Sequence, residues 1–528
     1  MADNTSPAPT TPFLQDRAVL VLGLGASGLA VARWCARAGA SVTVADSRES
    51  PPQRAALQLE LPAVRFIGGP LDAALLQHAP ASLVVKSPGL APAALAALTG
   101  AAQAAGVAVT GELGLFAQAL LELQHTHAYR PQVLAVTGTN GKTTVTALTG
   151  QLVARGGKSV AVAGNIGPTL LDTLAGHLDA GTLPEVWVLE LSSFQLADLA
   201  PGDGPAAAGA PAAFEPSAAT VLNITQDHLD WHGSMADYTR AKARVFGQQA
   251  LMVLNQDDPL VMALRAPAAK GRPQRACICF GAGMPQRPGD FGIEQVNGMS
   301  WLVRALELDP TIKLRKGQPA EELHIQRLIP AEALRIRGRH NAVNALAALA
   351  LAAAAGCTLA PLLFGLREYR GEPHRVESIG VIQDVEYFDD SKGTNVGATV
   401  AALNGLGAER RLVPILGGDG KGQDFSPLAA PVARYARAVV LIGRDAPRIR
   451  AALQGTSVPM VAASDMEHAV QLARESAHAG DAVLLSPACA SFDQYPNFEV
   501  RGDAFVKAVA ALPGAVMANN GDQHAART

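Results

Sequence analysis

The sequence is poor in cysteine and in charged residues. Lysine, arginine, aspartate and glutamate make up 17% of the 528 residues, and the formal net charge is −3. This near balance gives no general attraction to nucleic acid or to an anionic membrane. The five cysteines (Cys35, Cys277, Cys279, Cys357 and Cys489) are odd in number, and their spacing fits neither zinc binding nor a disulfide framework. A reducing cytosol is the simplest compartment for such a chain, so we expect a cytoplasmic protein.

Targeting and membrane signals are also lacking. The opening stretch MADNTSPAPTTPF has no basic start and no apolar core, so it does not predict a signal peptide. One apolar run spans residues 344–366, but its first part is weakly hydrophobic alanine, and Gly356 and Pro361 interrupt it. It predicts two buried helices joined by a turn, and we expect no membrane insertion.

What the chain does have is three segments in which apolar strand-like runs alternate with helical stretches. This alternation predicts an α/β fold with largely parallel sheets. We place the boundaries at residues 1–127, 128–371 and 372–515, followed by a loose tail at 516–528. Residues 200–216 are low in complexity and predict a loop, and residues 264–330 predict a small β-rich elaboration.

The first segment opens with a glycine motif between two strands. Gly23, Gly25 and Gly28 follow an apolar strand, and Asp46 ends the next one. Such glycines let the backbone approach a pyrophosphate, and the helix that follows offers N–H groups and positive potential. The pattern matches a dinucleotide site, and any diphosphate-linked nucleotide such as a UDP-sugar fits it equally. The structural alternative is a tight turn without a ligand.

The second segment opens with a shortened phosphate loop. In VTGTNGKTT, Gly138 and Gly141 are separated by two residues, where the common pattern has four. A strand precedes the loop and a helix follows it, so we expect the N–H groups of residues 139–143 to cradle phosphates. Lys142 would neutralise β- and γ-phosphate charge, and Thr143 would offer its hydroxyl to Mg²⁺.

Other polar residues of this segment follow strands or begin helices. Glu190 ends an apolar strand, where a carboxylate can hold Mg²⁺ or be an ordinary strand-end acid. His228 stands between two aspartates and is a candidate for a second Mg²⁺ or for a reacting phosphate. Lys242 on a helix reads by itself as a solvated lysine. For Asn341, at a helix start, a capping role competes with a nucleotide contact, and Asn344 lies one turn further on.

The third segment repeats the pattern of polar loops after strands. These loops contain Arg375; Asp390, Lys392 and Thr394; Lys421; and Ser491 and Phe498. Open α/β sheets bind ligands beyond the carboxyl ends of their strands, so this segment predicts one half of a binding cleft.

Taken together, these motifs resemble the Mur ligase family over nearly the whole chain. The matching stretches include GLGASG, TGTNGKTT, GNIG, ELSSFQL, DHLD, AKARVF, RHNAVNA, HRVE, DDSKGTN, GGDGKG and SPACASFDQYPNFEVRGDAF. The resemblance implies a Rossmann-like amino-terminal domain, a central P-loop ATPase domain and a Rossmann-like carboxy-terminal domain. It also implies a cytoplasmic, ATP- and Mg²⁺-dependent ligase that adds D-glutamate to UDP-N-acetylmuramoyl-L-alanine through an acyl phosphate, for peptidoglycan synthesis. We expect a monomer.

The resemblance also implies roles for individual residues. ATP is expected at Gly138, Thr139, Asn140, Gly141, Lys142, Thr143, Thr144, Asn341, Asn344, Arg375 and Asp390. The UDP substrate is expected at Gly25, Ala26, Ser27, Asp46, Arg48, Ser87, Gly89, Asn165 and Ser192. D-glutamate is expected at Lys392, Thr394, Lys421, Ser491 and Phe498. The metal ligands would be Thr143, Glu190, His228 and a carbamylated Lys242, and Lys142, His228 and Lys242 would be catalytic.

Some features depart from the family or leave alternatives open. Trp231 stands where many members have arginine, Gly393 stands where alanine is common, and the two excursions exceed the usual length. Ligases for other amino acids and folylpolyglutamate synthases are close rivals, although the SPACASFDQ block favours D-glutamate. A nicotinamide-dependent oxidoreductase and a non-catalytic nucleotide-binding regulator are the more distant alternatives.

Overall fold

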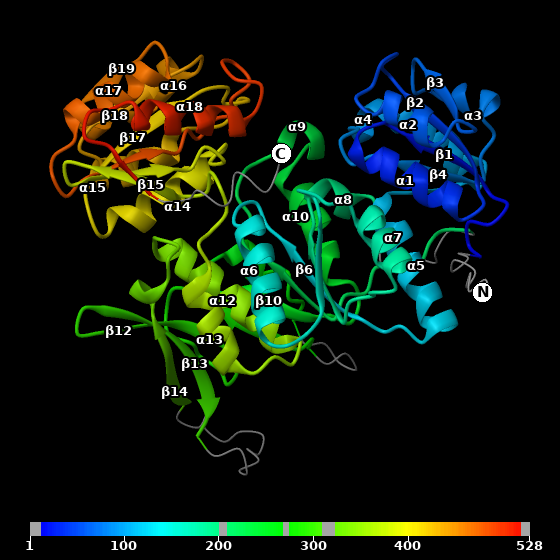
Figure 1. The fold of residues 1–528 in the computed structure, drawn as a ribbon, viewed down its shortest axis with the longest axis horizontal. Coiled ribbons are helices and arrows are strands. Elements are labelled where there is room, and N and C mark those ends of the chain that lie inside the picture. The colour runs from blue at the N-terminus through cyan, green and yellow to red at the C-terminus, as the bar shows by residue number, and fades with distance from the viewer. Residues whose placement is uncertain (1–11, 200–208, 268–273, 309–322, 519–528) are drawn as a thin grey trace, which may run out of the picture.

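The computed structural model describes residues 12–199, 209–267, 274–308 and 323–518. Each of the three sequence segments forms its own sheet. Figure 1 shows the amino-terminal unit in blue and the carboxy-terminal unit in yellow to red. Both lie above the central unit, which is cyan to green. Among the described residues, no helix has both the length and the apolar character to cross a membrane.

The amino-terminal unit is a parallel sheet in the order β3-β2-β1-β4-β5. Val19 and Val21 pack on one side of the sheet and Leu20 and Leu22 on the other, because a parallel sheet is covered by helices on both faces. Its elements are β1 (Ala18–Leu22), α1 (Ala26–Arg37), β2 (Ser41–Asp46), α2 (Arg54–Glu60), β3 (Arg65–Gly68), α3 (Leu75–His78), β4 (Leu83–Lys86), α4 (Pro92–Ala104) and β5 (Ala108–Thr110).

Helix α5 (Glu112–His127) leads from this unit to the central one and packs on it. The ring of Phe116 lies edge-on to Trp187, with centroids 5.2 Å apart. Helix α1 also packs on α7 (Leu170–Ala180), and Arg33 forms a 3.0 Å ion pair with Asp172 there. One continuous core therefore joins the amino-terminal sheet to the central sheet.

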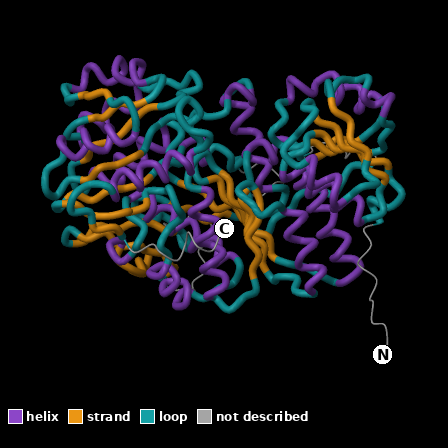
Figure 2. The backbone as a smooth tube through the Cα atoms, turned by 45° about the horizontal axis from the view of Figure 1, so that its top comes forward, coloured by secondary structure: helices purple, strands orange, loops and turns teal. Residues whose placement is uncertain are grey.

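The central unit is a nine-stranded sheet in the order β14-β13-β12-β11-β10-β9-β6-β8-β7, parallel from β7 to β12 and antiparallel beyond. Its strands stand out at the centre of Figure 2. The elements are β6 (Gln132–Thr137), α6 (Lys142–Arg155), β7 (Val160–Gly164), α7, β8 (Val186–Glu190), α8 (Ser193–Ala197), β9 (Ala218–Val221), α9 (Leu229–His232), α10 (Met235–Ala243), β10 (Leu251–Asn255), α11 (Pro259–Met262), β11 (Cys277–Phe280), β12 (Phe291–Val296), β13 (Met299–Glu307), β14 (Leu323–Pro330), α12 (Arg339–Ala354) and α13 (Leu359–Glu368).

Two expectations about this unit are confirmed. Helices α12 and α13 are the two helices foreseen in residues 344–366, and they pack with α6 against one face of the sheet. Strands β11 to β14 form the β-rich elaboration foreseen in residues 264–330, which extends the sheet as an antiparallel edge. Residues 268–273 and 309–322 of that stretch, and residues 200–208 of the low-complexity loop, lie outside the described residues.

The carboxy-terminal unit has seven strands in the order β19-β18-β17-β20-β16-β15-β21, in which β15 runs antiparallel to its two neighbours and the other pairs are parallel. Val516 and Met517, the first residues of the expected tail, instead form β21 and pair with β15. The elements are β15 (Glu377–Ile382), β16 (Val385–Asp389), α14 (Val396–Gly407), β17 (Leu412–Gly417), α15 (Ala429–Tyr435), β18 (Val439–Ile442), α16 (Ala446–Leu453), β19 (Met460–Ala462), α17 (Met466–Ser476), β20 (Ala482–Leu485), α18 (Phe498–Ala510) and β21 (Val516–Met517).

Candidate active site

The shortened loop joins β6 to α6 and requires its glycines. Gly138 has φ +154° and Gly141 has φ +82°, a region that favours glycine. A Cβ atom on Gly141 would also lie 2.8 Å from Oδ1 of Asn344. Helix α6 begins at Lys142, so its first amides have no acceptor within the helix and face outward as an anion site.

The expectation that all amides from 139 to 143 are open to phosphate is wrong for two of them. The N–H of Thr139 donates to the Asn223 carbonyl at 2.9 Å, and the N–H of Asn140 donates to Oδ1 of Asn223 at 2.8 Å. Asn223 follows β9 and fixes the loop from the neighbouring strand. The amides left open to an anion are therefore those of Gly141 and of the first turn of α6.

Two lysines converge on the same loop carbonyl. The Nζ atoms of Lys142 and Lys242 donate to the Gly138 oxygen at 3.0 and 2.7 Å. Lys242 is 1% exposed on α10, so the solvated-lysine interpretation is wrong. Burial and the charge of Lys142 lower the pKa of Lys242 well below its ordinary value, and burial lowers the pKa of Lys142.

Glu190 lies at the end of β8 and has a carboxylate oxygen to spare. Its Oε1 accepts from Asn165 Nδ2 at 3.0 Å, while its buried Oε2 has no hydrogen-bond partner among the described residues. Thr143 lines the same cavity, and its hydroxyl accepts from Arg375 at 3.1 Å. Carboxylate and hydroxyl oxygens are ligands that Mg²⁺ prefers, so these residues fit the metal.

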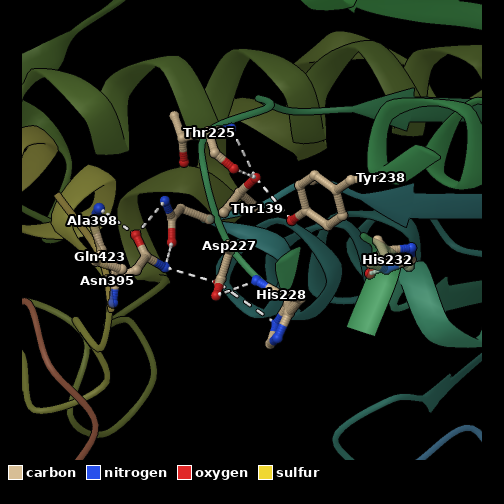
Figure 3. Close-up of polar contacts among 12 residues, drawn as sticks. Thr139, Thr225, Asp227, His228, His232, Tyr238, Asn395, Ala398 and Gln423 are labelled. Atoms are coloured by element: carbon tan, nitrogen blue, oxygen red, sulfur yellow. Dashed lines mark hydrogen bonds and ion pairs between the residues drawn. The ribbon is translucent and has the colours of Figure 1, made fainter. Parts of the chain in front are cut away.

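A polar network joins the central unit to the carboxy-terminal unit beside His228 (Figure 3). Asn395 exchanges side-chain hydrogen bonds of 3.2 and 3.0 Å with Asn140, and it donates to Asp227 at 3.3 Å. Asp227 accepts the His228 N–H at 2.9 Å. Burial lowers the pKa of His228 against the opposing charge of Asp227, which keeps the imidazole neutral and able to bind a metal.

The carboxy-terminal loops bring two lysines with aromatic partners. The Nζ of Lys392 lies 3.9 Å from the centroid of the Phe498 ring, and that of Lys421 lies 5.6 Å from the centroid of Phe492. Burial, together with the charges of Arg375 and Lys142, lowers the pKa of Lys392 to about 8. Two cations of this kind suit a ligand that carries two carboxylates.

A buried arginine holds these loops together. Arg501 donates to Oγ and O of Ser391 at 3.0 and 2.7 Å and to the Cys489 carbonyl at 3.0 Å. Ser391 adjoins Lys392, and Cys489 is two residues from Ser491. Arg501 therefore fixes the position of both loops from α18.

The remaining predicted nucleotide contacts lie on α12 and directly after β16, and they line one cavity. Gly338 is the N-cap of α12 and makes no side-chain cap bond, so the capping role weighed for Asn341 is wrong. Asn341 donates to the Arg337 carbonyl at 2.8 Å and accepts from Asn344 at 3.1 Å. Asp390 accepts from Ser486 at 2.6 Å, and burial raises its pKa to about 7.

One cavity of about 760 Å³ gathers nearly all of these groups. It is lined by the loop residues after Gly138, by Asn165, Glu190, Ser192, His228, Lys242, Asn341, Asn344, Arg375, Asp390, Lys392, Thr394, Lys421, Ser491 and Phe498. Gly138 is not part of this lining, and its carbonyl accepts the hydrogen bonds of Lys142 and Lys242. The hydroxyl of Ser192 is also part of a capping box with Gln195 at the start of α8.

The predicted diphosphate loop lies apart from this cavity, on the amino-terminal unit. A Cβ atom on Gly28 would come within 2.0 Å of the Gly23 oxygen, whereas Gly25 faces open space. The Asp46 carboxylate already accepts from the Leu24 N–H at 2.8 Å and from the Arg48 guanidinium, which lowers its pKa to about 2. Both oxygens are engaged, so nothing here favours the ribose contact of a nicotinamide enzyme.

Two of the other residues expected at the UDP substrate have hydrogen-bond partners within the protein. Ser87 donates to the Gly23 carbonyl at 3.1 Å, and Ser27 lies at the start of α1 beside the carboxyl of Glu112. Ala26 opens α1, and Gly89 follows β4 with open space around it.

Trp231, which stands where many Mur ligases have arginine, lies between the amino-terminal and central units. Its ring contacts Phe194 at 4.8 Å between centroids, and the Nζ of Lys86 lies 5.6 Å from its centroid. Lys86 ends β4 and forms a buried ion pair with Asp198, which follows α8. Trp231 thus belongs to a link between the amino-terminal and central units.

Three residues with clear roles in this geometry were missed as sites: Asn223, Asn395 and Arg501. Asn223 and Asn395 stand in polar stretches after strands, and this position in the sequence is itself a signal for a site residue. Arg501 carries no such local signal, because it reaches the loops from the first turns of a helix far along the chain.

The comparisons with known proteins cover the three units in turn. Sequence profiles match the Mur ligase MurD-like N-terminal domain at residues 17–111, the Mur ligase middle domain at 136–352 and the Mur ligase glutamate ligase domain at 374–489. The UDP-N-acetylmuramoylalanine--D-glutamate ligase of Albidiferax ferrireducens is 67% identical over 506 residues, covering 95% of this chain and 97% of the relative. That of Burkholderia vietnamiensis is 56% identical over 500 residues, covering 93% and 96%.

Among solved structures, MurF from Acinetobacter baumannii has a TM-score of 0.54 at 17% identity, covering 94% of this chain and 92% of that one, which shows the fold alone. A phosphate loop that faces a third α/β unit across one cavity defines a nucleotide-dependent enzyme of three domains. The chain belongs to the Mur ligase family.

Proposed function

We propose that the protein is an ATP-dependent, C–N bond-forming ligase that adds D-glutamate to UDP-N-acetylmuramoyl-L-alanine in peptidoglycan synthesis. The observation that carries this is the single cavity in which a phosphate loop, a buried carboxylate and two lysines of the third unit meet. The 67% identical relative bears the name of this activity. The ligase acts in the cytoplasm, where ATP is available, and it acts as a monomer. Its three domains divide at residues 127/128 and 371/372.

The first half of the reaction transfers a phosphoryl group. The alanyl carboxylate of the UDP substrate attacks the γ-phosphorus of ATP, and the bond to the β-γ bridging oxygen breaks with release of ADP. Lys142 and the amides of α6 bind the phosphates, and Arg375 contacts them beside Thr143. Asn341 and Asn344, on α12 next to the phosphate loop, contact the nucleoside part of ATP.

Thr143, Glu190, His228 and Lys242 would hold magnesium. When bound, the ion neutralises phosphate charge and orients the reacting oxygens. Burial lowers the pKa of Lys242 and so favours its neutral amine, which is the form that adds to CO₂ with loss of a proton. The resulting carbamate would supply a carboxylate at a position where the sequence provides lysine.

The second half forms the amide. The amine of D-glutamate attacks the acyl phosphate, and the tetrahedral adduct expels phosphate. Lys392 and Lys421 bind the two carboxylates of D-glutamate, and Thr394, Ser491 and Phe498 complete the pocket. Cations around the loop stabilise the oxyanion that develops.

The diphosphate of the UDP substrate binds on the amino-terminal unit, at the Gly25–Ser27 turn and near Arg48. Its muramoyl part extends past Asn165 and Ser192 into the cavity. Because the contacts for one substrate lie on two units, binding requires those units to keep a fixed spacing.

The decisive experiment measures phosphate release by the purified protein with ATP, magnesium, bicarbonate and UDP-N-acetylmuramoyl-L-alanine. Release is expected with D-glutamate and not with L-alanine, L-lysine or diaminopimelate. An absence of ADP with all three reactants would refute a ligase, and preference for another amino acid would refute the D-glutamate assignment.

A further inference from the structure

Two cysteines that play no part in the ligase site lie side by side on β11. Cys277 and Cys279 are two residues apart on one strand, so both side chains point to the same face of the sheet. Cys277 is half-buried and Cys279 is buried. Neither cysteine lines the cavity that holds the phosphate loop.

An arginine is held against both sulfurs. The Nη2 of Arg287 lies 3.3 Å from Sγ of Cys277 and 2.8 Å from Sγ of Cys279. Asp290 fixes that arginine through a 3.1 Å contact to Nε, and it also accepts the Cys279 N–H at 2.6 Å. The guanidinium therefore cannot leave the sulfurs without breaking its ion pair.

We propose that Cys277, Cys279 and Arg287 form a thiol modification site for peroxides and other small electrophiles. A guanidinium that donates to a sulfur favours the thiolate, which is the nucleophilic form of cysteine. Asp290 carries the opposing charge, and Arg265 adds a second positive one.

The two sulfurs have different tasks. A hydrogen bond from Cys279 and the contact with Arg287 lower the pKa of Cys277 to about 6, whereas the same hydrogen bond and burial raise the pKa of Cys279. The guanidinium and the neighbouring thiol thus favour one thiolate in the pair at neutral pH. Cys277 is the attacking group because it is the more accessible of the two sulfurs.

With hydrogen peroxide the chemistry balances in two steps. The Cys277 thiolate attacks one peroxide oxygen; the S–O bond forms, the O–O bond breaks, and hydroxide leaves and takes a proton to become water. Sγ of Cys279 then attacks the sulfenic sulfur; the S–S bond forms, the S–O bond breaks, and the hydroxyl leaves with the Cys279 proton as a second water. The thiols lose two electrons, and the peroxide gains them.

The strand geometry makes this disulfide easy to reduce. Residues two apart on an extended strand have Cα atoms about 6.7 Å apart, close to the upper limit for a disulfide. Closing the bond therefore strains β11 between β10 and β12. Strained disulfides have more oxidising potentials, so small thiols should reverse this one.

The test is alkylation of the intact chain with iodoacetamide between pH 5 and 9.5, with the modified cysteine located by mass spectrometry. Cys277 should react first with a midpoint near pH 6, while the buried Cys35 and Cys489 stay unmodified. The R287M variant should raise the midpoint above pH 8, whereas the rate at pH 7 should change by less than about threefold, because a more basic thiolate is scarcer but intrinsically more nucleophilic. R327M, on β14 and away from the sulfurs, is the matched control.

Hydrogen peroxide provides the second measurement. The wild type should lose two mass units and recover them with dithiothreitol, and C279S should stop at a sulfenic acid that dimedone traps on Cys277. A wild-type midpoint near pH 8.5, or labelling of Cys277 no faster than that of Cys35, overturns the proposal even if R287M does not fold. None of these measurements depends on ligase activity.

Discussion

The ion pair between Lys86 and Asp198 offers a quantitative test of how the amino-terminal unit is attached. Lys86 is 11% exposed and Asp198 is 2% exposed, so both charges are removed from water. Burial raises the pKa of Asp198 to about 6 in spite of the attraction of Lys86. Ionising this carboxyl in the folded protein therefore costs about 3 kcal/mol more than in the unfolded chain.

The K86M variant removes the partner and leaves Asp198 buried. The carboxyl can then take up a proton, which costs about 5 kcal/mol at pH 7.5 for a group with a reference pKa near 3.9. Protonation therefore sets an upper limit on the free energy that a buried Asp198 can cost the folded state. About 3 kcal/mol of this cost is already present in the wild type, where Asp198 is ionised at its raised pKa. We therefore expect K86M to lose at most about 2 kcal/mol of unfolding free energy through Asp198, less than the 3–5 kcal/mol typical of a broken buried pair.

The pH dependence follows from the sign of the shift. A carboxyl whose pKa is raised on folding binds more protons in the folded state, so wild-type stability falls as pH rises from about 4 to 6. In K86M the fall continues to higher pH. Below about pH 5 both folded proteins hold the protonated carboxyl, so the contribution of Asp198 to the difference between them should vanish. K86M/D198N has no charge at residue 198 and should be at least as stable as the wild type at pH 7.5.

The assay is urea unfolding followed by tryptophan fluorescence at pH 4.5 and 7.5, since the Trp231 ring lies beside Lys86. K507M, an exposed lysine on α18, is the control and should be neutral at both pH values. A loss in K86M that is as large at pH 4.5 as at pH 7.5, or a double variant less stable than K86M, would refute the reasoning.

The remaining predictions concern the active site. K142A should abolish ADP formation while leaving the Kd for the UDP substrate nearly unchanged; equal loss of both would contradict the assignment of the two sites to separate units. K242A should be nearly inactive and partly rescued by added short carboxylic acids, and full activity without them would exclude the carbamate. Because the pKa of Lys392 is about 8, its cation is lost as pH rises through that value, so KM for D-glutamate should rise above pH 8 in the wild type relative to K392Q; a constant ratio from pH 7 to 9.5 would exclude this role. W231A should raise KM for the UDP substrate about threefold to thirtyfold through loss of the cation–π contact, with KM for ATP unchanged and with W231F partly restoring it; a change in KM for ATP alone would show that Trp231 does not position the UDP substrate.

The fold class was predictable because its signals are local. Alternating apolar runs, the glycine turns after β1 and β6, and the polar loops after strands are each contained in a few consecutive residues. The carboxyl ends of parallel strands meet at one edge of a sheet, so nearly all predicted residues of the central and carboxy-terminal units line one cavity.

The limits of sequence reasoning show at individual groups. Lys242 reads as a surface lysine, and its burial comes from packing of α10 against the loop 104 residues earlier. The amides of Thr139 and Asn140 look free for phosphate, and Asn223 occupies them from 83 or more residues away. Each outcome depends on which strands are neighbours, and strand order is not a local property.

By itself, the sequence determined the three α/β units, the phosphate loop and the chemical character of the loops that follow the strands, because dihedral preference and hydrophobic period act over a few residues. The tertiary structure decided how those units meet: through Asn395 and Asn140 across 255 residues on one side of the central unit, and through Lys86, Asp198 and Trp231 on the other. These contacts depend on the packing of whole domains against one another. That packing decides which side chains are buried, and burial in turn shifts the pKa of a group such as Asp198 and determines which partner it meets.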